Sequence, residues 1–291
     1  MKFGAVDNPS EIIFQLPDDQ FDAISGQNNF RVLTGYPKWT KKDLPGLFPK
    51  GVKDELNYYA SQFDAIELNA TFYTDYNKDQ IIKWKERTGP NFRFYPKVHR
   101  FVSHIKRLKD SRDSVDRFCE SVWYFAEKLG TCFLQLHDNF GPENMDRLVT
   151  FLNYWPVDLP LAIELRHSDW YTDQETYKTL VQLLKKYNVT NILTDTAGRR
   201  DLLHMNPVTT IPFIRFVATG HKSDYTRLND WVERLGKWRD KGVNTVAFFI
   251  HQNAELESPL LSQYFIDQLN NRLFLNINKP KIITNTQTSL F

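Results

Sequence analysis

Acidic, basic and amide side chains recur near the ends of short apolar segments along this chain. In Phe63–Asn69, for example, Glu67 and Asn69 alternate with Ile66 and Leu68. Successive side chains of a β-strand point to opposite faces, so the polar residues of such a segment share one face. Carboxylates beside cationic groups are the side chains that acid/base catalysis and anion binding use.

The same alternation recurs in later segments, such as Leu161–Arg166, where Glu164 and Arg166 oppose two aliphatic residues. Seven segments are expected to bring polar side chains to one common face: Glu67, Asn69, Lys97, Gln135, Glu164, Arg166, Asp195, Arg215, His251 and Asn253. Burying so many charges is costly unless they pair or meet a ligand. The set therefore predicts a ligand site, with the alternative that ion pairs such as Glu164–Arg166 only stabilise the fold.

Adjoining loops add further candidates, namely Tyr73, His104, His167 and Trp170. Gly220 and Lys222 follow the seventh apolar segment. In barrel enzymes the loops after strands seven and eight often hold a phosphate, which predicts a second anion contact there.

The elements that position these residues form a repeating pattern. Apolar runs of strand type alternate with amphipathic stretches; the runs are Phe30–Thr34, Phe63–Asn69, Phe92–Val98, Cys132–Leu136, Leu161–Arg166, Asn191–Asp195, Pro212–Val217 and Thr245–Asn253. Eight such units over about 240 residues predict an α/β fold, a TIM-type (β/α)8 barrel. Helices are expected over Ser114–Leu129 and Asp224–Asp240, and a weak or missing helix between strands six and seven.

The chain reads as one domain of 291 residues, with an irregular leader at 1–29, the barrel at 30–273 and a tail at 274–291. The net charge of +2 gives no global field that would attract nucleic acid or an anionic membrane. Two cysteines, no signal-peptide pattern and no membrane-length apolar run predict a cytoplasmic protein. The sequence also lacks the glycine-rich, serine-elbow and His-Glu-x-x-His motifs of dinucleotide enzymes, P-loop NTPases, common serine hydrolases and zincins.

At this point the residues resemble a known family. The chain resembles the DUF72 (YecE-like) family in the order of its motifs. These are Phe63-Asp-Ala-Ile-Glu-Leu-Asn-Ala-Thr-Phe-Tyr73, Lys97, Ser103-His104, Leu134-Gln-Leu, Glu164-Leu-Arg-His-Ser-Asp-Trp170, Asp195, Arg215 and Asn253. The resemblance implies a TIM barrel whose biochemical role is unsettled. A suggested likeness of the family to metal-dependent endonuclease barrels makes nucleic acid a candidate partner.

The chain departs from the family pattern in three places. The first strand ends in Leu33-Thr-Gly-Tyr-Pro-Lys-Trp39, His137-Asp138 replace the usual prolines, and Val217 stands where a histidine is usual. These changes predict a variant subgroup with its own ligand preference.

The first functional hypothesis is an enzyme (a hydrolase, lyase or isomerase) that acts on a small anionic, phosphorylated or sugar-like compound. Lys97, Arg166 and Arg215 would hold the anion, Glu67 or Glu164 would be the base, and Asp195 or His104 the acid. Lys97 is itself a candidate catalytic residue. The substrate would also contact Asn69, Tyr73, Gln135, His167, Trp170 and Asn253.

Two alternatives stay open. A metal-dependent phosphodiesterase or endonuclease acting on nucleic acid would use Glu67, His137, Glu164 and His251 as ligands of a divalent metal, although neighbouring cations would repel the ion. A ligand-binding protein without catalysis would use the same barrel rim. The sequence identifies no cofactor, predicts no membrane partner and leaves the oligomeric state open.

Overall fold

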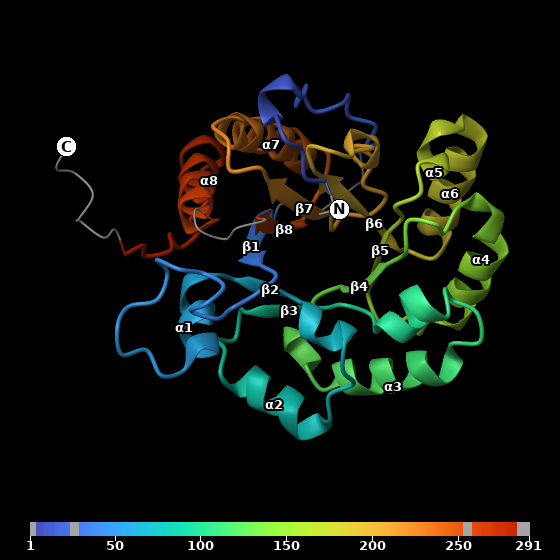
Figure 1. The fold of residues 1–291 in the computed structure, drawn as a ribbon, viewed down its shortest axis with the longest axis horizontal. Coiled ribbons are helices and arrows are strands. Elements are labelled where there is room, and N and C mark those ends of the chain that lie inside the picture. Colours follow the sequence, from blue (N-terminus) through green and yellow to red (C-terminus); the bar gives the residue numbers. More distant parts are fainter. Residues whose placement is uncertain (1–3, 24–28, 253–257, 284–291) are drawn as a thin grey trace.

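Eight parallel strands form a nearly closed barrel in the computed structural model, which describes residues 4–23, 29–252 and 258–283. The strands are β1 (Arg31–Tyr36), β2 (Ala65–Leu68), β3 (Arg93–Pro96), β4 (Cys132–Gln135), β5 (Leu161–Glu164), β6 (Thr190–Asp195), β7 (Phe213–Ala218) and β8 (Thr245–Gln252). Their spatial order is β3-β2-β1-β8-β7-β6-β5-β4, and the helices lie outside the ring (Figure 1). The predicted TIM-type barrel is confirmed.

Helices connect most successive strands. They are α1 (Glu55–Gln62), α2 (Lys78–Glu86), α3 (Arg112–Trp123), α4 (Met145–Tyr154), α5 (Asp169–Thr172), α6 (Gln174–Lys186), α7 (Ser223–Asp240) and α8 (Ser258–Leu273). Several begin at a side-chain cap; for example, Asp54 accepts a hydrogen bond from the Asn57 amide at the start of α1. Between β6 and β7 the chain forms only a 3-10 turn at Arg200–Leu202, which confirms the missing helix.

One predicted helix ends early. The pattern indicated a helix from Ser114 to Leu129, but α3 ends at Trp123 and a separate 3-10 turn follows at Ala126–Lys128. Ala126 has a φ of 49°, a left-handed conformation that an α-helix cannot contain. The apolar spacing continues past this break because Phe125 is still buried.

The barrel interior is filled by an apolar layer to which every strand contributes: Leu33, Ala65, Tyr95, Phe133, Ala162, Ile192, Phe213, Ala247 and Phe249. Four of these are aromatic and contact each other; the Phe213 ring centroid lies 5.5 Å from that of Tyr95 and 5.1 Å from that of Phe249. We call these nine residues the apolar floor. The next interior residue on each strand comes two positions later, towards the carboxyl end, because side chains alternate.

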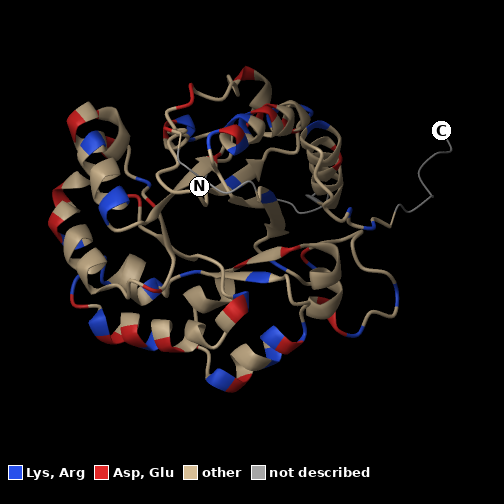
Figure 2. Cartoon of the chain, turned by 180° about the vertical axis from the view of Figure 1, so that it is seen from behind, with Lys and Arg blue, Asp and Glu red and all other residues tan. Residues whose placement is uncertain are grey.

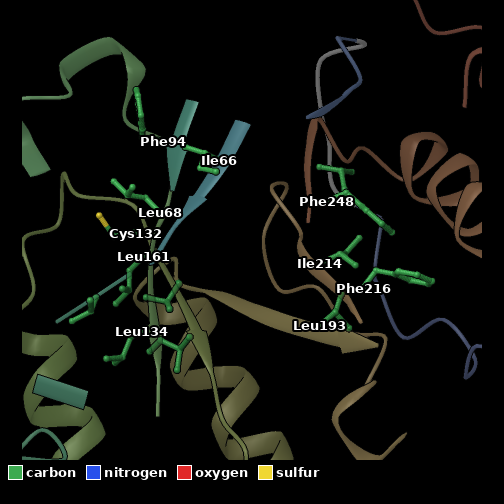
Figure 3. Close-up of a cluster of buried hydrophobic side chains, with 14 of the residues drawn as sticks. Ile66, Leu68, Phe94, Cys132, Leu134, Leu161, Leu193, Ile214, Phe216 and Phe248 are labelled. Atoms are coloured by element: carbon green, nitrogen blue, oxygen red, sulfur yellow. The ribbon is translucent and has the colours of Figure 1, made fainter. Parts of the chain in front are cut away.

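The opposite faces of the strands form a second apolar layer against the helices. Figure 3 shows this layer from several strands, with Ile66, Leu134 and Phe216 among the labelled side chains. The aliphatic members of the alternating sequence pattern therefore hold the outer helices, which leaves the polar members of the same strands inside the barrel.

The ladder between β3 and β4 is interrupted. In the part of the chain that the structure describes, the backbones at this junction are paired only through two isolated bridges, Phe94 to Leu129 and Lys97 to Phe133. Their backbone hydrogen bonds run from Gly130 to Phe94 (2.7 Å) and from Val98 to Phe133 (2.8 Å). We call this junction the β3–β4 seam.

The amino-terminal segment packs along α7. The indole of Trp238 donates to Asp19 (2.8 Å), and Arg234 donates to the carbonyl of Pro17 (2.6 Å). Near the other end, the amide of Ile283 donates to the carbonyl of Gly46 (2.8 Å).

Acidic and basic residues are interspersed over the outer helices (Figure 2). The helices within the described part of the chain are too short or too polar to cross a bilayer.

Candidate active site

Two glutamates and one arginine form the centre of a charged cluster directly above the apolar floor. Glu67 on β2 and Glu164 on β5 lie on either side of Arg215 on β7. The guanidinium donates to both oxygens of Glu67 (3.1 and 3.2 Å) and to Glu164 Oε2 (2.6 Å). Each of the three side chains stands two residues after a member of the floor, so strand alternation places them at one level.

Further polar groups complete the bonding of each glutamate. Asn69 donates to Glu67 Oε1 (3.0 Å), and His251 Nε2 lies 2.8 Å from Glu67 Oε2. Arg166 Nε donates to Glu164 Oε1 (2.7 Å), and the Gln135 amide donates to Glu164 Oε2 (2.9 Å). The amide oxygen of Gln135 in turn accepts from Lys97 Nζ (2.9 Å). These eight side chains, Glu67, Asn69, Lys97, Gln135, Glu164, Arg166, Arg215 and His251, are the charged cluster.

Both carboxylates of the cluster are held ionised. Burial alone would raise the pKa of Glu67, but the charges of Arg215 and His251 and their hydrogen bonds outweigh it and hold that pKa well below its usual range. Burial of Glu164 is outweighed in the same way by Arg166 and Arg215. The pKa of Arg215 is raised, because the two glutamates outweigh its burial.

Lys97 differs from the arginines in its surroundings. Its ammonium lies 4.3 Å from the centre of the Phe72 ring and 5.8 Å from that of Phe133. Burial and the positive charge of Arg215 lower the pKa of Lys97 to about 7. Lys97 therefore changes protonation near neutral pH, whereas burial lowers the pKa of His251 and leaves that imidazole mainly neutral at pH 7.

His104 lies beside the cluster, in the turn Phe101–Ile105 after β3. Its ring contacts those of Phe72 (centroids 5.0 Å apart) and His137 (5.7 Å), and its Nδ1 bonds the Ser103 hydroxyl (2.9 Å). Burial and the charge of Lys97 lower the pKa of His104 to about 4. The imidazole is neutral at pH 7, which argues against its predicted role as a charged acid.

Asp195 lies outside the charged cluster, contrary to its expected placement. Its carboxylate forms ion pairs with Arg227 (2.9 Å) and with Arg200, and it accepts a hydrogen bond from the Trp231 indole (2.8 Å). Ile192 of the apolar floor points into the barrel, so Thr194, two residues later on β6, points inward as well. Asp195 therefore lies on the opposite face of the strand, towards α7. The aspartate ends its strand, but on the other face.

The loop candidates are dispersed. Trp170 is fully buried and donates to the carbonyl of Phe140 (2.6 Å), so it is a core residue and not a wall of the site. His167 lies 3.7 Å from Asp169. Tyr73 is exposed and packs edge-on against Phe72 (4.9 Å). Asn253 lies outside the described residues.

The expected phosphate contact after β7 is occupied by the protein itself. Asp224 Oδ2 accepts from the amides of Thr219 (2.8 Å) and Gly220 (2.9 Å). A carboxylate of α7 therefore takes the place that the sequence assigned to an external anion.

The four proposed metal ligands do not form a group. Arg215 lies between Glu67 and Glu164, and His137 contacts His104 instead. Across residues 4–23, 29–252 and 258–283, no three His, Cys, Asp or Glu side chains are arranged to hold an ion.

Sequence reasoning missed two residues of the site. Phe72 covers the Lys97 ammonium, and the Thr194 hydroxyl is buried at the register position opposite Arg215. Counting from Ile192 would have found Thr194. Phe72 lies in the 3-10 turn Asn69–Phe72, where no strand periodicity applies.

Comparison with known proteins gives a consistent result. Residues 33–283 match the family described as "Protein of unknown function DUF72". The UPF0759 protein YecE of Escherichia coli K12 is 27% identical over 252 residues, which cover 79% of this chain and 89% of the relative.

Two solved structures are also similar. A DUF72 family protein from Enterococcus faecalis V583 has a TM-score of 0.68 at 18% identity and covers 86% of this chain and 98% of its own. Another, from Thermotoga maritima MSB8, has a TM-score of 0.63 at 20% identity, with 84% and 99% covered. At these identities the two structures support the fold alone.

Proposed function

Since this chain belongs to the DUF72 family, whose description assigns it no activity, we propose a function from its own side chains. We infer an enzyme that binds a small anionic, phosphorylated or sugar-like compound at the carboxyl ends of the strands and acts on it by acid/base chemistry. The observation that carries the proposal is an imbalance of charge: the cluster contains the cations Lys97, Arg166 and Arg215 but only the carboxylates Glu67 and Glu164.

The imbalance favours an anionic ligand. Both glutamates already bind arginine, so the charge of a protonated Lys97 has no carboxylate to pair with in the cluster. A buried charge without a partner is costly, and an anion that enters the site would neutralise it. The side chain of Arg166 is more exposed than that of Arg215, at 13% against 9%, so we propose it as the first anion contact.

The pKa values favour Lys97 as the group that moves a proton. A proton carrier works best when its pKa lies near the working pH. The pKa values of Glu67 and Glu164 lie too low for an effective base, whereas that of Lys97 is about 7. Proton abstraction next to a carbonyl, the chemistry of a lyase or isomerase, suits this arrangement.

The alternatives have less support. A metal-dependent nuclease would need the two glutamates as metal ligands, yet Arg215 binds both. A ligand-binding protein would share the anion contact and lack turnover, so a screen for turnover separates it from an enzyme.

The anion contact is tested by thermal shift with inorganic phosphate, 3-phosphoglycerate, glucose 6-phosphate and a short single-stranded oligonucleotide. A ligand at about 100 times its Kd stabilises a protein by about 2.7 kcal/mol. We expect stabilisation by at least one of the small anions, its loss in Arg166→Gln, and its retention in Arg272→Gln, which removes only a surface ion pair with Glu233. The proposal is refuted if no anion stabilises the protein, or if both variants respond alike.

The pH dependence provides a second readout. Sulfate, whose charge does not change in this range, favours the ammonium form of Lys97, so its affinity should fall as the pH rises through about 7. The reaction class would follow from a screen of phosphorylated aldehydes and ketones for exchange of a proton with deuterated solvent.

A further inference from the structure

The amine of Lys97 has few polar partners for a buried lysine. Lys97 is 8% exposed, and its Nζ donates one hydrogen bond, to the amide oxygen of Gln135. Phe72 and Phe133 cover it with ring faces. Within the described residues no carboxylate forms an ion pair with this amine, since Glu67 and Glu164 bind Arg215.

Gln135 keeps the amine apart from Glu164. Its amide nitrogen donates to Glu164, which fixes its oxygen towards Lys97. The lysine therefore meets a neutral acceptor where a carboxylate would have held the ammonium. The charged groups around it come from several elements: Glu67 and Glu164 raise its pKa, whereas burial, Arg215 and Arg166 lower it.

Lys128 shows what a structural buried lysine looks like in the same protein. It is 7% exposed, and its Nζ donates to the carbonyls of Lys85 (2.7 Å) and Thr88 (2.7 Å) and to the Thr88 hydroxyl (3.2 Å). These three acceptors match the three hydrogens of an ammonium and so stabilise the charged form of Lys128, whose nitrogen has no lone pair. Among the described residues Lys97 Nζ has one such acceptor, the amide oxygen of Gln135, and as a free amine it keeps its lone pair available.

We propose that Lys97 is a nucleophile that forms an imine with the carbonyl carbon of a small aldehyde or ketone bearing a carboxylate or phosphate group. The inference rests on the function proposed above, because Arg166 would hold the anionic group while the carbonyl meets the amine. Desolvation beside aromatic rings and a neighbouring cation is the environment that activates lysine for this chemistry.

The step balances without a further reactant. The nitrogen lone pair forms the new C–N bond, and the electrons of the carbonyl π bond move to the oxygen. Both amine hydrogens leave with that oxygen as water when the C=N bond forms. The imine then withdraws electrons from the adjacent carbon and makes its C–H group more acidic.

The test is reductive trapping with named probes. The full-length protein is incubated with glyoxylate or glycolaldehyde phosphate and sodium cyanoborohydride at about pH 6, 7 and 8, and the adducts are located by peptide mass mapping. At pH 7 an amine of pKa about 7 has on the order of 10³ times more free base than an ordinary lysine. We expect at least tenfold more adduct on Lys97 than on exposed Lys237 or buried Lys128, rising from pH 6 to pH 8.

The internal controls keep the result interpretable whatever the variants do. Lys97→Arg should lose the adduct, but the comparison with Lys128 and Lys237 needs no variant at all. Equal labelling of Lys97 and Lys237 would overturn the imine. If inorganic phosphate still stabilises the protein in that case, the proposed anion-binding function stands. Sulfate binding should weaken with rising pH while trapping increases, so the two proposals are separable.

Discussion

Arg215 is the residue whose removal tests the charged cluster most directly. It donates three hydrogen bonds to two buried carboxylates, so Arg215→Met leaves two negative charges without their main partner. Breaking a buried ion pair by removing one side costs about 3–5 kcal/mol. Arg166 still bonds Glu164, and Asn69 still bonds Glu67, so we expect a loss of about 3–5 kcal/mol at pH 7.5 rather than twice that amount.

The sign of the pH dependence makes this prediction specific. In the wild type both glutamates have lowered pKa values, so their contribution is present above the unfolded-state pKa and is lost as pH falls below it. In Arg215→Met, burial without the guanidinium raises their pKa, so the folded variant takes up protons on acidification. Uptake of one proton changes the free energy of unfolding by about 1.4 kcal/mol per pH unit. The stability that Arg215→Met loses relative to the wild type should therefore be smaller at pH 5 than at pH 7.5, by about 1–3 kcal/mol.

The assay is urea unfolding followed by tryptophan fluorescence at both pH values. Arg272→Met is the matched control, because its ion pair with Glu233 is exposed and should contribute less than about 1 kcal/mol at either pH. A deficit below about 1 kcal/mol for Arg215→Met, or one that does not change with pH, would contradict the reasoning.

Two more substitutions test the boundaries of the site. Asp195→Asn should destabilise the protein by about 3–5 kcal/mol in urea unfolding, because it removes the negative charge that pairs with buried Arg227. Phosphate binding should stay unchanged, and an altered phosphate affinity in a correctly folded variant would show that Asp195 belongs to the site. Phe72→Leu should lower the pKa of Lys97 by about 0.4–0.7, because a ring face favours the ammonium by about 0.5–1 kcal/mol. Competitive acetylation across pH measures this pKa, and an unchanged or raised value would show that the ring does not act on the ammonium.

Strand alternation predicted most residues of the charged cluster, because the polar residues of these strands alternate with aliphatic ones in the sequence. Glu67 and Glu164 stand between aliphatic residues, so their face could be read directly. In β6 the neighbours Ile192 and Leu193 are both apolar. The sequence therefore shows no alternation of polar and apolar residues that would tell which of Thr194 and Asp195 faces the barrel interior. Position near the end of a strand was then the only guide, and it does not specify a face.

Loop residues were harder to place because no period constrains them. Trp170 follows β5 like a rim residue, but its indole meets a backbone carbonyl of the preceding loop and turns into the core. The bonds of Thr219 and Gly220 to Asp224 depend on a side chain four to five residues ahead, which spacing alone cannot distinguish from a vacant anion site. Local hydrogen bonding, and not periodicity, decided both outcomes.

The β3–β4 seam affects how firmly the barrel is closed. The five paired positions of β1–β8 and the six of β7–β8 resist separation more strongly than the two isolated bridges of the β3–β4 seam. Lys97 is attached to one of those bridges, so its backbone would move with any such spreading. A widening of the barrel at this seam would therefore move the Lys97 amine relative to Glu67, Glu164 and Arg215.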